Sequence, residues 1–365
     1  MNIFLTGSTG YLGVHLVREF LSKSDCELYC LVRAQDEEQA NEKLRRSLSK
    51  WKISLDEDTL SHVHCITGDL EKDKLGMSDE AYEEMSVKAD IVFHNAAWVN
   101  WLLPADLLGK VNADGTKRIL EFSDHGRDKK LYFVSSLSVF PFDGVSYTER
   151  SSIDSDFALY GGYAQSKWLA EMVVQRAIKR GKDAVIMRPN LITRRSDDGV
   201  FSTAAFFENC LKSFIQLGIA PDMNSDMAVV PVDYVSKGMA HIVFDENKTE
   251  RVYHLNNPHS AKMSEIIGWI KDMGYDIKIY PLEKWKKALF ASEGFFENGL
   301  YQFRPFVYGL KDGYMLMGKS YSKLTDDYLG SAGITCHPID RELINTYVKY
   351  FALSGFLNGV QEVKA

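Results

Sequence analysis

Three side chains in the middle of the chain have the types and the spacing to handle a proton. Tyr163 and Lys167 are four residues apart, so a helix places them on one face. A tyrosine hydroxyl titrates near pH ~10, and a neighbouring ammonium group is expected to lower its pKa by stabilising the tyrosinate. Ser136 follows an apolar run and can hydrogen-bond a substrate carbonyl. We predict that Ser136, Tyr163 and Lys167 stabilise charge on oxygen when a hydride arrives, as in a nicotinamide-dependent reductase.

A tyrosine and a lysine at this spacing also occur as ordinary helix-surface pairs, so the prediction depends on a second motif. The apolar run at residues 2–6 is followed by a turn spaced Gly-x-x-Gly-x-x-Gly, which opens a helix. Gly7 permits a tight turn, Gly10 lets the backbone approach a pyrophosphate, and Gly13 lets the helix pack on the strand. The N-terminus of that helix would bind the diphosphate through its free N–H groups. The predicted cofactor residues of this turn are Gly7, Ser8, Thr9, Gly10, Tyr11, Leu12 and Gly13.

The end of the second strand decides between NAD and NADP. An acid there would bind the ribose 2′-hydroxyl, but this strand ends in Arg33, whose planar guanidinium suits a 2′-phosphate. We therefore predict NADPH, with Asp36 or Glu37 as the alternative contact to a ribose. Other predicted cofactor contacts lie at strand ends or near the catalytic residues: Asp69, Leu70, Asn95, Ala96, Ala97, Asn112, Lys167 and Pro189.

The elements that must position these residues alternate along the first half of the chain. Apolar strands are predicted at residues 2–6, 28–32, 63–67, 90–94, 130–134 and 184–187, with helical stretches between them. This pattern predicts an α/β fold with a doubly wound parallel sheet, covered by helices on both faces. We expect residues 1–190 to form the Rossmann domain, completed by segments near 228–256 that include a strand at 252–255. Residues 191–365 are expected to form a smaller, discontinuous, mostly helical substrate-binding lobe.

Composition narrows the class of protein further. A net charge of −7 argues against nucleic acid as a main partner, because phosphate binding needs a basic face. The five cysteines are scattered without metal-ligand spacing, so we expect buried, reduced thiols, no metal site and a cytoplasmic protein. The chain enters its first strand at once, which leaves no room for a signal peptide. No apolar run is long enough to insert into a bilayer.

With these motifs combined, the chain resembles the extended short-chain dehydrogenase/reductases (SDRs). Within them it is similar to the thioester reductase (R) domains that terminate nonribosomal peptide and polyketide synthetases and carboxylic acid reductases. The matching stretches lie within about the first 240 residues, at 7–13, 31–34, 68–70, 94–97, 99–101, 134–139, 163–168, 188–189 and 231–235.

The resemblance implies a reaction, a partner and a set of site residues. The reaction is NADPH-dependent reduction of an acyl thioester, held on the phosphopantetheine arm of a carrier protein, to an aldehyde or further to an alcohol. The catalytic triad falls on Ser136, Tyr163 and Lys167, and substrate contacts fall on Trp101 and Asn190. The family commonly has Thr in place of Ser136, which keeps the hydroxyl. It usually has Gly at Asn190 and Arg194, so the loop shape and substrate choice are expected to differ.

Two other functions stay open at this point. One is a sugar-nucleotide epimerase or dehydratase, which uses the same triad with tightly bound NAD. The other is a non-catalytic NADP-binding protein. Arg33 and the Val99-Asn100-Trp101 stretch favour the reductase. For docking of an acidic carrier protein, the candidate basic patches are Lys284, Lys286 and Lys287, or Arg194 and Arg195.

Overall fold

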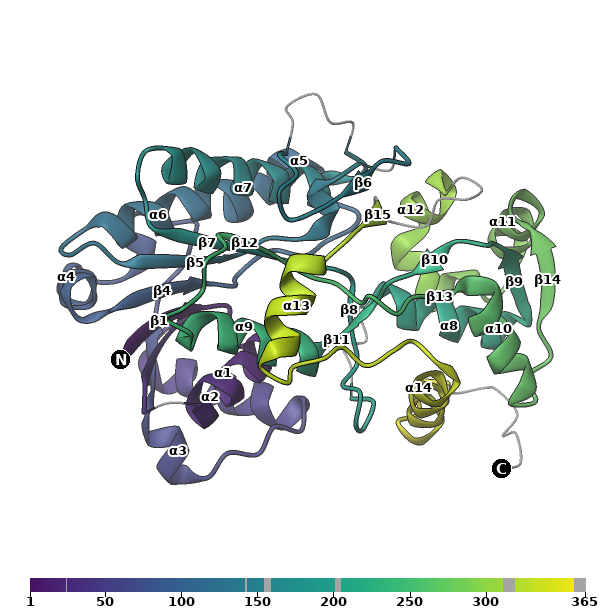
Figure 1. The fold of residues 1–365 in the computed structure, drawn as a ribbon. Coiled ribbons are helices and arrows are strands. Elements are labelled where there is room, and N and C mark those ends of the chain that lie inside the picture. Colours follow the sequence, from purple (N-terminus) through teal and green to yellow (C-terminus); the bar gives the residue numbers. More distant parts are fainter. Residues whose placement is uncertain (24, 142, 154–158, 201–204, 311–318, 358–365) are drawn as a thin grey trace.

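Seven parallel strands form the sheet on which the chain is built (Figure 1). The computed structural model describes residues 1–23, 25–141, 143–153, 159–200, 205–310 and 319–357. The strand order is β12-β7-β5-β4-β1-β2-β3. The strands are Asn2–Thr6 (β1), Glu27–Val32 (β2), Val63–Thr67 (β3), Ile91–His94 (β4), Lys130–Val134 (β5), Ala184–Pro189 (β7) and Val252–Leu255 (β12).

This sheet confirms the predicted doubly wound α/β fold. Every predicted strand is present, and its ends lie within two residues of the predicted ones. The prediction succeeds because strands buried on both faces are continuous apolar runs, as the fully buried Ile3, Phe4 and Leu5 illustrate. The strand order reverses between β1 and β4, and the crevice beyond the carboxyl ends at such a point is where ligands bind in this class of fold.

Helices cover both faces of the sheet (Figure 1). Helices α1, α2 and α9 pack in one apolar core with one face, and α4, α6 and α7 pack in a second core with the other. The bounds are Tyr11–Lys23 (α1), Glu37–Lys50 (α2), Glu57–Ser61 (α3), Asp79–Lys88 (α4), Ala105–Gly109 (α5), Gly115–Asp124 (α6), Gly162–Lys179 (α7), Val232–Phe244 (α9) and Lys323–Ser331 (α13).

The C-terminal part is helix-rich, as predicted, and has its own apolar core. In Figure 1 it lies beyond the carboxyl ends of the strands. Its helices are Phe206–Leu217 (α8), Met263–Asp272 (α10), Leu282–Ala291 (α11), Arg304–Gly309 (α12) and Arg341–Leu353 (α14). Sequence patterns did not reveal the short two-stranded ladders: Ile219–Asp222 (β9) with Lys278–Pro281 (β14), Asp226–Met227 (β10) with Ala261–Lys262 (β13), Ile192–Thr193 (β8) with Val230–Pro231 (β11), and Ser146–Tyr147 (β6) with Lys319–Ser320 (β15).

The chain crosses between the two parts more than once. Strand β12 follows residues of the C-terminal lobe and pairs with β7, so that Leu255 lies opposite Pro189. Helix α13 lies beside the sheet near β12, and α14 then returns to the lobe (Figure 1). The boundary that we expect near residue 190 stays a prediction.

Two expectations from composition can be compared with the structure directly. All five cysteines are buried and unpaired, as predicted. Among the helices that the structure describes, none has the length and apolarity that a membrane span requires.

Candidate active site

Helix α7 carries a column of polar side chains along one buried face. Tyr163, Lys167 and Glu171 are spaced four residues apart, and Lys167 and Glu171 are 2% and 0% exposed. The Lys167 ammonium donates to the carbonyl oxygen of Val134 at the end of β5, at 2.7 Å, and lies 4.6 Å from the Phe133 ring centroid. Burial lowers the pKa of Lys167 to about 8, and the Glu171 carboxylate opposes that shift.

The Tyr163 hydroxyl is free to meet a ligand. It makes no hydrogen bond to any residue in the described ranges, and its ring is half-buried. Burial raises its pKa to about 12. The expectation that Lys167 lowers this pKa is therefore wrong for this structure, because the ammonium is bound to the Val134 carbonyl instead. A phenol with a raised pKa is protonated at neutral pH, which is the form that donates a proton.

Ser136 is placed as a hydrogen-bond donor by its own neighbours. It caps a short 3₁₀ turn at Leu137–Val139, and its Oγ accepts from the backbone N–H of Ser138 at 3.1 Å. The Ser138 hydroxyl also donates to this oxygen, at 2.9 Å. Because Ser136 accepts in both bonds, its own O–H remains available for a substrate oxygen.

A buried network below the triad links the strand that ends in Ser136 to the helix that carries Lys167. The Ser135 hydroxyl donates to Glu171 at 2.5 Å, and Arg188 of β7 pairs with the same carboxylate at 2.5 Å. Arg188 also contacts His254 of β12, at 3.1 Å. The sequence analysis missed Glu171 and His254 as site residues. The available signal for Glu171 was its position two four-residue steps after Tyr163 along α7, on the same helix face.

Asn112 lies in a π-helical turn, Lys110–Asp114, between α5 and α6. Its side chain clamps the backbone of Trp98: Oδ1 accepts from the N–H at 2.7 Å and Nδ2 donates to the carbonyl at 3.1 Å. Nδ2 also lies 2.9 Å from the Ser166 hydroxyl. The predicted contact of Asn112 with the cofactor stays a prediction, whereas the structure gives Asn112 a direct role in shaping the loop that precedes Trp101.

The Gly-rich turn fits a dinucleotide phosphate. Gly7 has φ +77°, and a Cβ there would meet the Ala96 backbone nitrogen at 2.7 Å. A Cβ on Gly13 would lie 2.0 Å from the Gly7 carbonyl oxygen, whereas one on Gly10 would meet only that oxygen, at 3.3 Å. Gly7 and Gly13 are thus required by close packing, and Gly10 leaves its outer side open to a ligand. The first helical bond runs from Val14 to Gly10, so the N–H groups of residues 11–13 have no acceptor within the helix.

Two of the predicted cofactor residues at the other strand ends, Asn95 and Ala96, contact this turn or the strand before it. Asn95 donates to the Gly7 carbonyl at 3.2 Å, and the Ala96 N–H donates to the Thr6 hydroxyl at 3.1 Å. Asp69 is half-buried and accepts from the N–H of Glu71, while Leu70 is buried. His94, which sequence reasoning did not assign a role, bonds Thr6 and Thr116 and so joins β1, β4 and α6; burial lowers its pKa to about 3.

Arg33 is exposed at the end of β2, and the Lys43 ammonium donates to its carbonyl oxygen at 2.5 Å. Of the two alternative ribose contacts, Asp36 caps α2 by accepting from the N–H of Gln39 at 2.8 Å, and Glu37 is exposed in the first turn of the same helix. Two cationic side chains, Arg33 and Lys43, therefore lie near the strand end, together with two acids, of which Asp36 already accepts one hydrogen bond and Glu37 is exposed.

A cavity of about 340 Å³ opens beside Tyr163. Its described walls are apolar or backbone and carry no charged side chain: Trp101, Leu102, Leu103, Pro104, Tyr160, Gly161, Gly162, Tyr163, Ala164, Pro305 and Phe306. They come from the loop after β4, the start of α7 and the start of α12. The first residue of α7 packs closely against the loop after β4. A Cβ on Gly162 would lie 2.3 Å from the Leu103 carbonyl oxygen.

The two predicted substrate residues differ in position. Trp101 lines the cavity, and its ring centroid is 5.8 Å from that of Tyr163 and 5.7 Å from that of Phe306. Asn190 instead donates from Nδ2 to Asn256 Oδ1 at 2.6 Å, and its Oδ1 accepts from the N–H of Leu191. It is not among the residues that line the cavity. Its assignment to substrate stays a prediction. Pro189 is buried at the end of β7, opposite Leu255.

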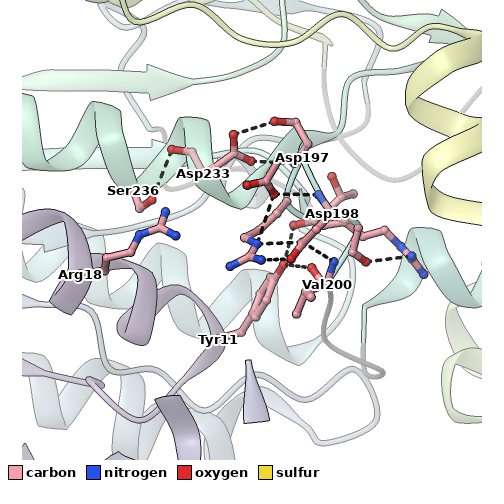
Figure 2. Close-up of polar contacts among 12 residues, drawn as sticks. Tyr11, Arg18, Asp197, Asp198, Val200, Asp233 and Ser236 are labelled. Carbon is pink, nitrogen blue, oxygen red and sulfur yellow. Dashed lines mark hydrogen bonds and ion pairs between the residues drawn. The ribbon is translucent and has the colours of Figure 1, made fainter. Parts of the chain in front are cut away.

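A side chain of the Gly-rich turn also reaches the loop after β8 (Figure 2). The Tyr11 hydroxyl donates to the Val200 carbonyl at 2.7 Å, and Asp233 of α9 accepts from the Ser196 N–H and hydroxyl at 2.9 and 2.7 Å. Arg195 pairs with Asp197 and Asp198 in the same loop. The cofactor turn and the loop that leads into the lobe are therefore tied together.

The predicted docking patches are largely wrong because packing buries them. Arg194 is 0% and Arg195 is 7% exposed. Lys286 is also 7% exposed, because its ammonium donates to the carbonyls of Tyr308 and Leu310 and pairs with Glu283. Only Lys284 and Lys287 of the predicted patches face solvent. His62 and His64 both bond Glu27, and no cluster of three metal-ligating side chains occurs within the described ranges.

Comparisons with known proteins agree with this geometry. Residues 5–239 match the family model described as "Male sterility protein", a family of NAD-binding domains. One component of the linear gramicidin synthase of Brevibacillus parabrevis is 31% identical, over 99% of this chain and 7% of that protein. L-2-aminoadipate reductase of Saccharomyces cerevisiae is 32% identical, over 82% of this chain and 23% of that protein.

Among solved structures, the terminal R domain from the myxalamid PKS-NRPS biosynthetic pathway matches with a TM-score of 0.93 and 30% identity. The match covers 99% of this chain and 92% of that one. The chain thus spans less than a quarter of the length of the two curated relatives, and nearly all of the solved R domain.

Proposed function

We propose a function from one premise: the chain belongs to the NAD-binding family described as male sterility protein. The function that the site supports best is NADPH-dependent reduction of an acyl thioester to an aldehyde and a free thiol. The observation that carries the proposal is that Tyr163 lines a cavity without charged side chains in its described wall, while its hydroxyl, whose pKa burial raises, makes no hydrogen bond within the described part of the chain.

Each residue of the triad has a defined task in this reaction. When bound, the nicotinamide cofactor supplies the hydride that reduces the thioester carbonyl carbon. Ser136 and Tyr163 donate hydrogen bonds to the carbonyl oxygen, and Tyr163 transfers its proton as negative charge develops there. Lys167 donates to the Val134 carbonyl and so holds α7, which carries Tyr163, against the end of β5, after which Ser136 follows. Collapse of the hemithioacetal breaks the carbon–sulfur bond and returns the hydroxyl proton to Tyr163, so one thioester, one NADPH and one proton from solvent give one aldehyde, one thiol and one NADP⁺.

The preference for NADPH is supported by the charges at the end of β2. Arg33 is exposed and Lys43 lies beside it, so both can meet a 2′-phosphate. One carboxylate oxygen of Asp36 is engaged in capping α2, whereas no acid follows directly on β2 at Arg33. We assign the diphosphate to the N–H groups of residues 11–13, at the helix N-terminus that Gly7, Gly10 and Gly13 shape.

The substrate carrier is proposed from the relatives. One of them is named as part of a peptide synthase and another as the terminal R domain of a PKS-NRPS pathway. We propose that the acyl group arrives on the phosphopantetheine arm of a carrier protein. The cavity wall carries no charged side chain for a nucleotide sugar in its described residues, which disfavours an epimerase or dehydratase. The free Tyr163 hydroxyl above a buried lysine disfavours a purely binding role.

A direct assay tests the proposal. The purified protein is incubated with NADPH and a panel of acyl-pantetheine thioesters, and NADPH, free thiol and carbonyl product are each quantified. We expect one thiol released per aldehyde formed. NAD that copurifies with the protein, together with no thiol release from any thioester, would instead identify the epimerase or dehydratase. NADPH binding without consumption would identify the non-catalytic protein.

A further inference from the structure

Tyr160, three residues before Tyr163, lines the cavity and is 44% exposed. Its hydroxyl donates to the carbonyl oxygen of Pro305 in α12, at 2.8 Å, which joins segments 145 residues apart in the sequence. Its ring packs edge-on against Phe306, with 5.7 Å between centroids. Tyr160, Pro305 and Phe306 all line the cavity.

Gly309, at the end of α12, permits this arrangement. A Cβ on Gly309 would lie 2.0 Å from the Tyr160 hydroxyl oxygen and 2.5 Å from the ring carbon that bears it. Those atoms are the far end of a flexible side chain, so an alanine there would push the Tyr160 ring aside rather than unfold the helix. Gly309 has no positive φ, so its backbone accepts alanine without strain.

The chemistry of the wall indicates which end of the substrate enters. Among the described lining residues the only side-chain polar atoms are the indole nitrogen of Trp101 and the hydroxyls of Tyr160 and Tyr163. A pantetheine arm contains two amides that would need partners there, whereas a hydrocarbon chain needs none. The volume of about 340 Å³ is at the small end for ligand pockets.

We propose that the cavity takes an uncharged, apolar acyl chain and that the Tyr160–Gly309 contact limits its length. Tyr160 is thus a specificity-determining residue, acting as the closed end of the acyl pocket beside the reacting carbonyl. This inference rests on the proposed thioester reduction. It adds the class of acyl group and the residue pair that sets its size.

A double-mutant comparison tests the pair. The value of kcat/KM is measured for straight-chain acyl-pantetheine thioesters of increasing length, in the wild type, Tyr160→Ala, Gly309→Ala and the double variant. Each single variant should raise the ratio of long-chain to short-chain kcat/KM by about 10-fold or more, the range for one methylene in an apolar pocket. In the Tyr160→Ala background, Gly309→Ala should change nothing, because the ring that it displaces is gone.

Two controls make the outcome specific. Tyr160→Phe keeps the ring and removes only the bond to Pro305, so it should shift the length preference less than Tyr160→Ala. The effect of each substitution on chain-length preference should be the same whether the thiol part of the substrate is pantetheine or N-acetylcysteamine. Equal changes for all chain lengths, additive single effects, or a response to the thiol part instead of the acyl part would each overturn the inference.

A binding measurement separates this inference from the proposed function. S-alkyl pantetheine thioethers cannot be reduced, and their affinity can be followed by calorimetry in wild type and variants. If no thioester is reduced but Tyr160→Ala selectively tightens binding of long S-alkyl chains, the proposed function is wrong and the length limit stands. If thioesters are reduced and the variants alter neither binding nor length preference, the length limit is wrong and the proposed function stands.

Discussion

The Ser135 hydroxyl lies 2.5 Å from the Glu171 carboxylate, and this contact, with the bond from Lys167 to the Val134 carbonyl, joins the end of β5 to α7. Ser135 precedes Ser136 at the end of β5, and Glu171 follows Lys167 by one turn of α7. Arg188 neutralises the same carboxylate from β7. All three side chains are buried, so the relative position of strand end and helix is held by charged hydrogen bonds in a low-dielectric interior.

The Glu171 charge is expected to set the alkaline limit of activity through Lys167. Burial lowers the pKa of Lys167 to about 8 and the Glu171 carboxylate raises it, so Glu171→Gln should lower it further. The alkaline limb of the pH–kcat profile should then move to lower pH, with activity near pH 6 least affected. Gln175→Ala, which removes a hydrogen bond to Glu171 but no charge, is the matched control. An unshifted limb in Glu171→Gln would show that Glu171 has only a structural role.

Ser136 should matter through its proton rather than its size. Ser136→Ala removes one donor to the developing oxyanion and should lower kcat about 10²–10³-fold. Ser136→Thr keeps the hydroxyl and should retain most of the activity. Ser138→Ala removes only the hydroxyl that donates to Ser136, so it should have a small effect. If Ser136→Ala and Ser138→Ala are equally impaired, the loss comes from the shape of the turn and not from the donated proton.

Arg33 is expected to select NADPH over NADH. A hydrogen bond to a charged group contributes about 1.5–3 kcal/mol, which corresponds to about one to two decades in affinity. Arg33→Ala should reduce the NADPH/NADH ratio of kcat/KM by that factor, chiefly by weakening NADPH. Arg46→Ala on the exposed face of α2 is the control for loss of a positive charge. A ratio that falls equally in both variants would mean that the preference comes from general charge and not from Arg33.

Glu208 should make stability depend on pH. It is fully buried, and burial raises its pKa from 4.5 to about 7, while Arg194 opposes the shift. Because its pKa is higher in the folded than in the unfolded protein, its contribution is complete below about pH 4.5 and is lost as pH rises through about 7.

Glu208→Gln cannot ionise, so its free energy of unfolding should fall less than that of the wild type between pH 5 and pH 8. The difference should be on the order of 3 kcal/mol for a shift of this size. Urea unfolding at the two pH values measures it, with Glu38→Gln on the exposed surface as the control. Parallel pH dependence of wild type and Glu208→Gln would contradict a raised Glu208 pKa.

The strands could be predicted because their signals are local, and so could the placement of Tyr163 and Lys167 on one helix. A strand buried on both faces is a continuous apolar run, and Tyr163 and Lys167 lie on one helical turn. The Glu171–Arg188 pair could not be predicted, because residues 17 apart meet only after β7 has joined the sheet. The cavity was also hidden, since Pro305 and Phe306 are about 140 residues from Tyr163.

The basic docking patches were predicted wrongly for a related reason. Arg194, Arg195 and Lys286 read as surface charges, but the packing of the lobe buries them and their partners are backbone carbonyls or nearby acids. The exposure of a charged side chain depends on which segments pack over it. Neither the neighbouring residues in the sequence nor the spacing of apolar residues shows which segments those are.

The most direct test of thioester reduction follows the transferred hydride and the released thiol. The protein is given NADPH that carries deuterium at the transferable C4 position, together with an acyl-pantetheine thioester, and the products are analysed by mass spectrometry and thiol titration. We predict an aldehyde with one deuterium on its carbonyl carbon, one equivalent of free thiol, and about 10²–10⁴-fold slower turnover in Tyr163→Phe with NADPH affinity retained. An aldehyde without deuterium, no thiol release, or undiminished turnover in Tyr163→Phe would contradict thioester reduction at this site.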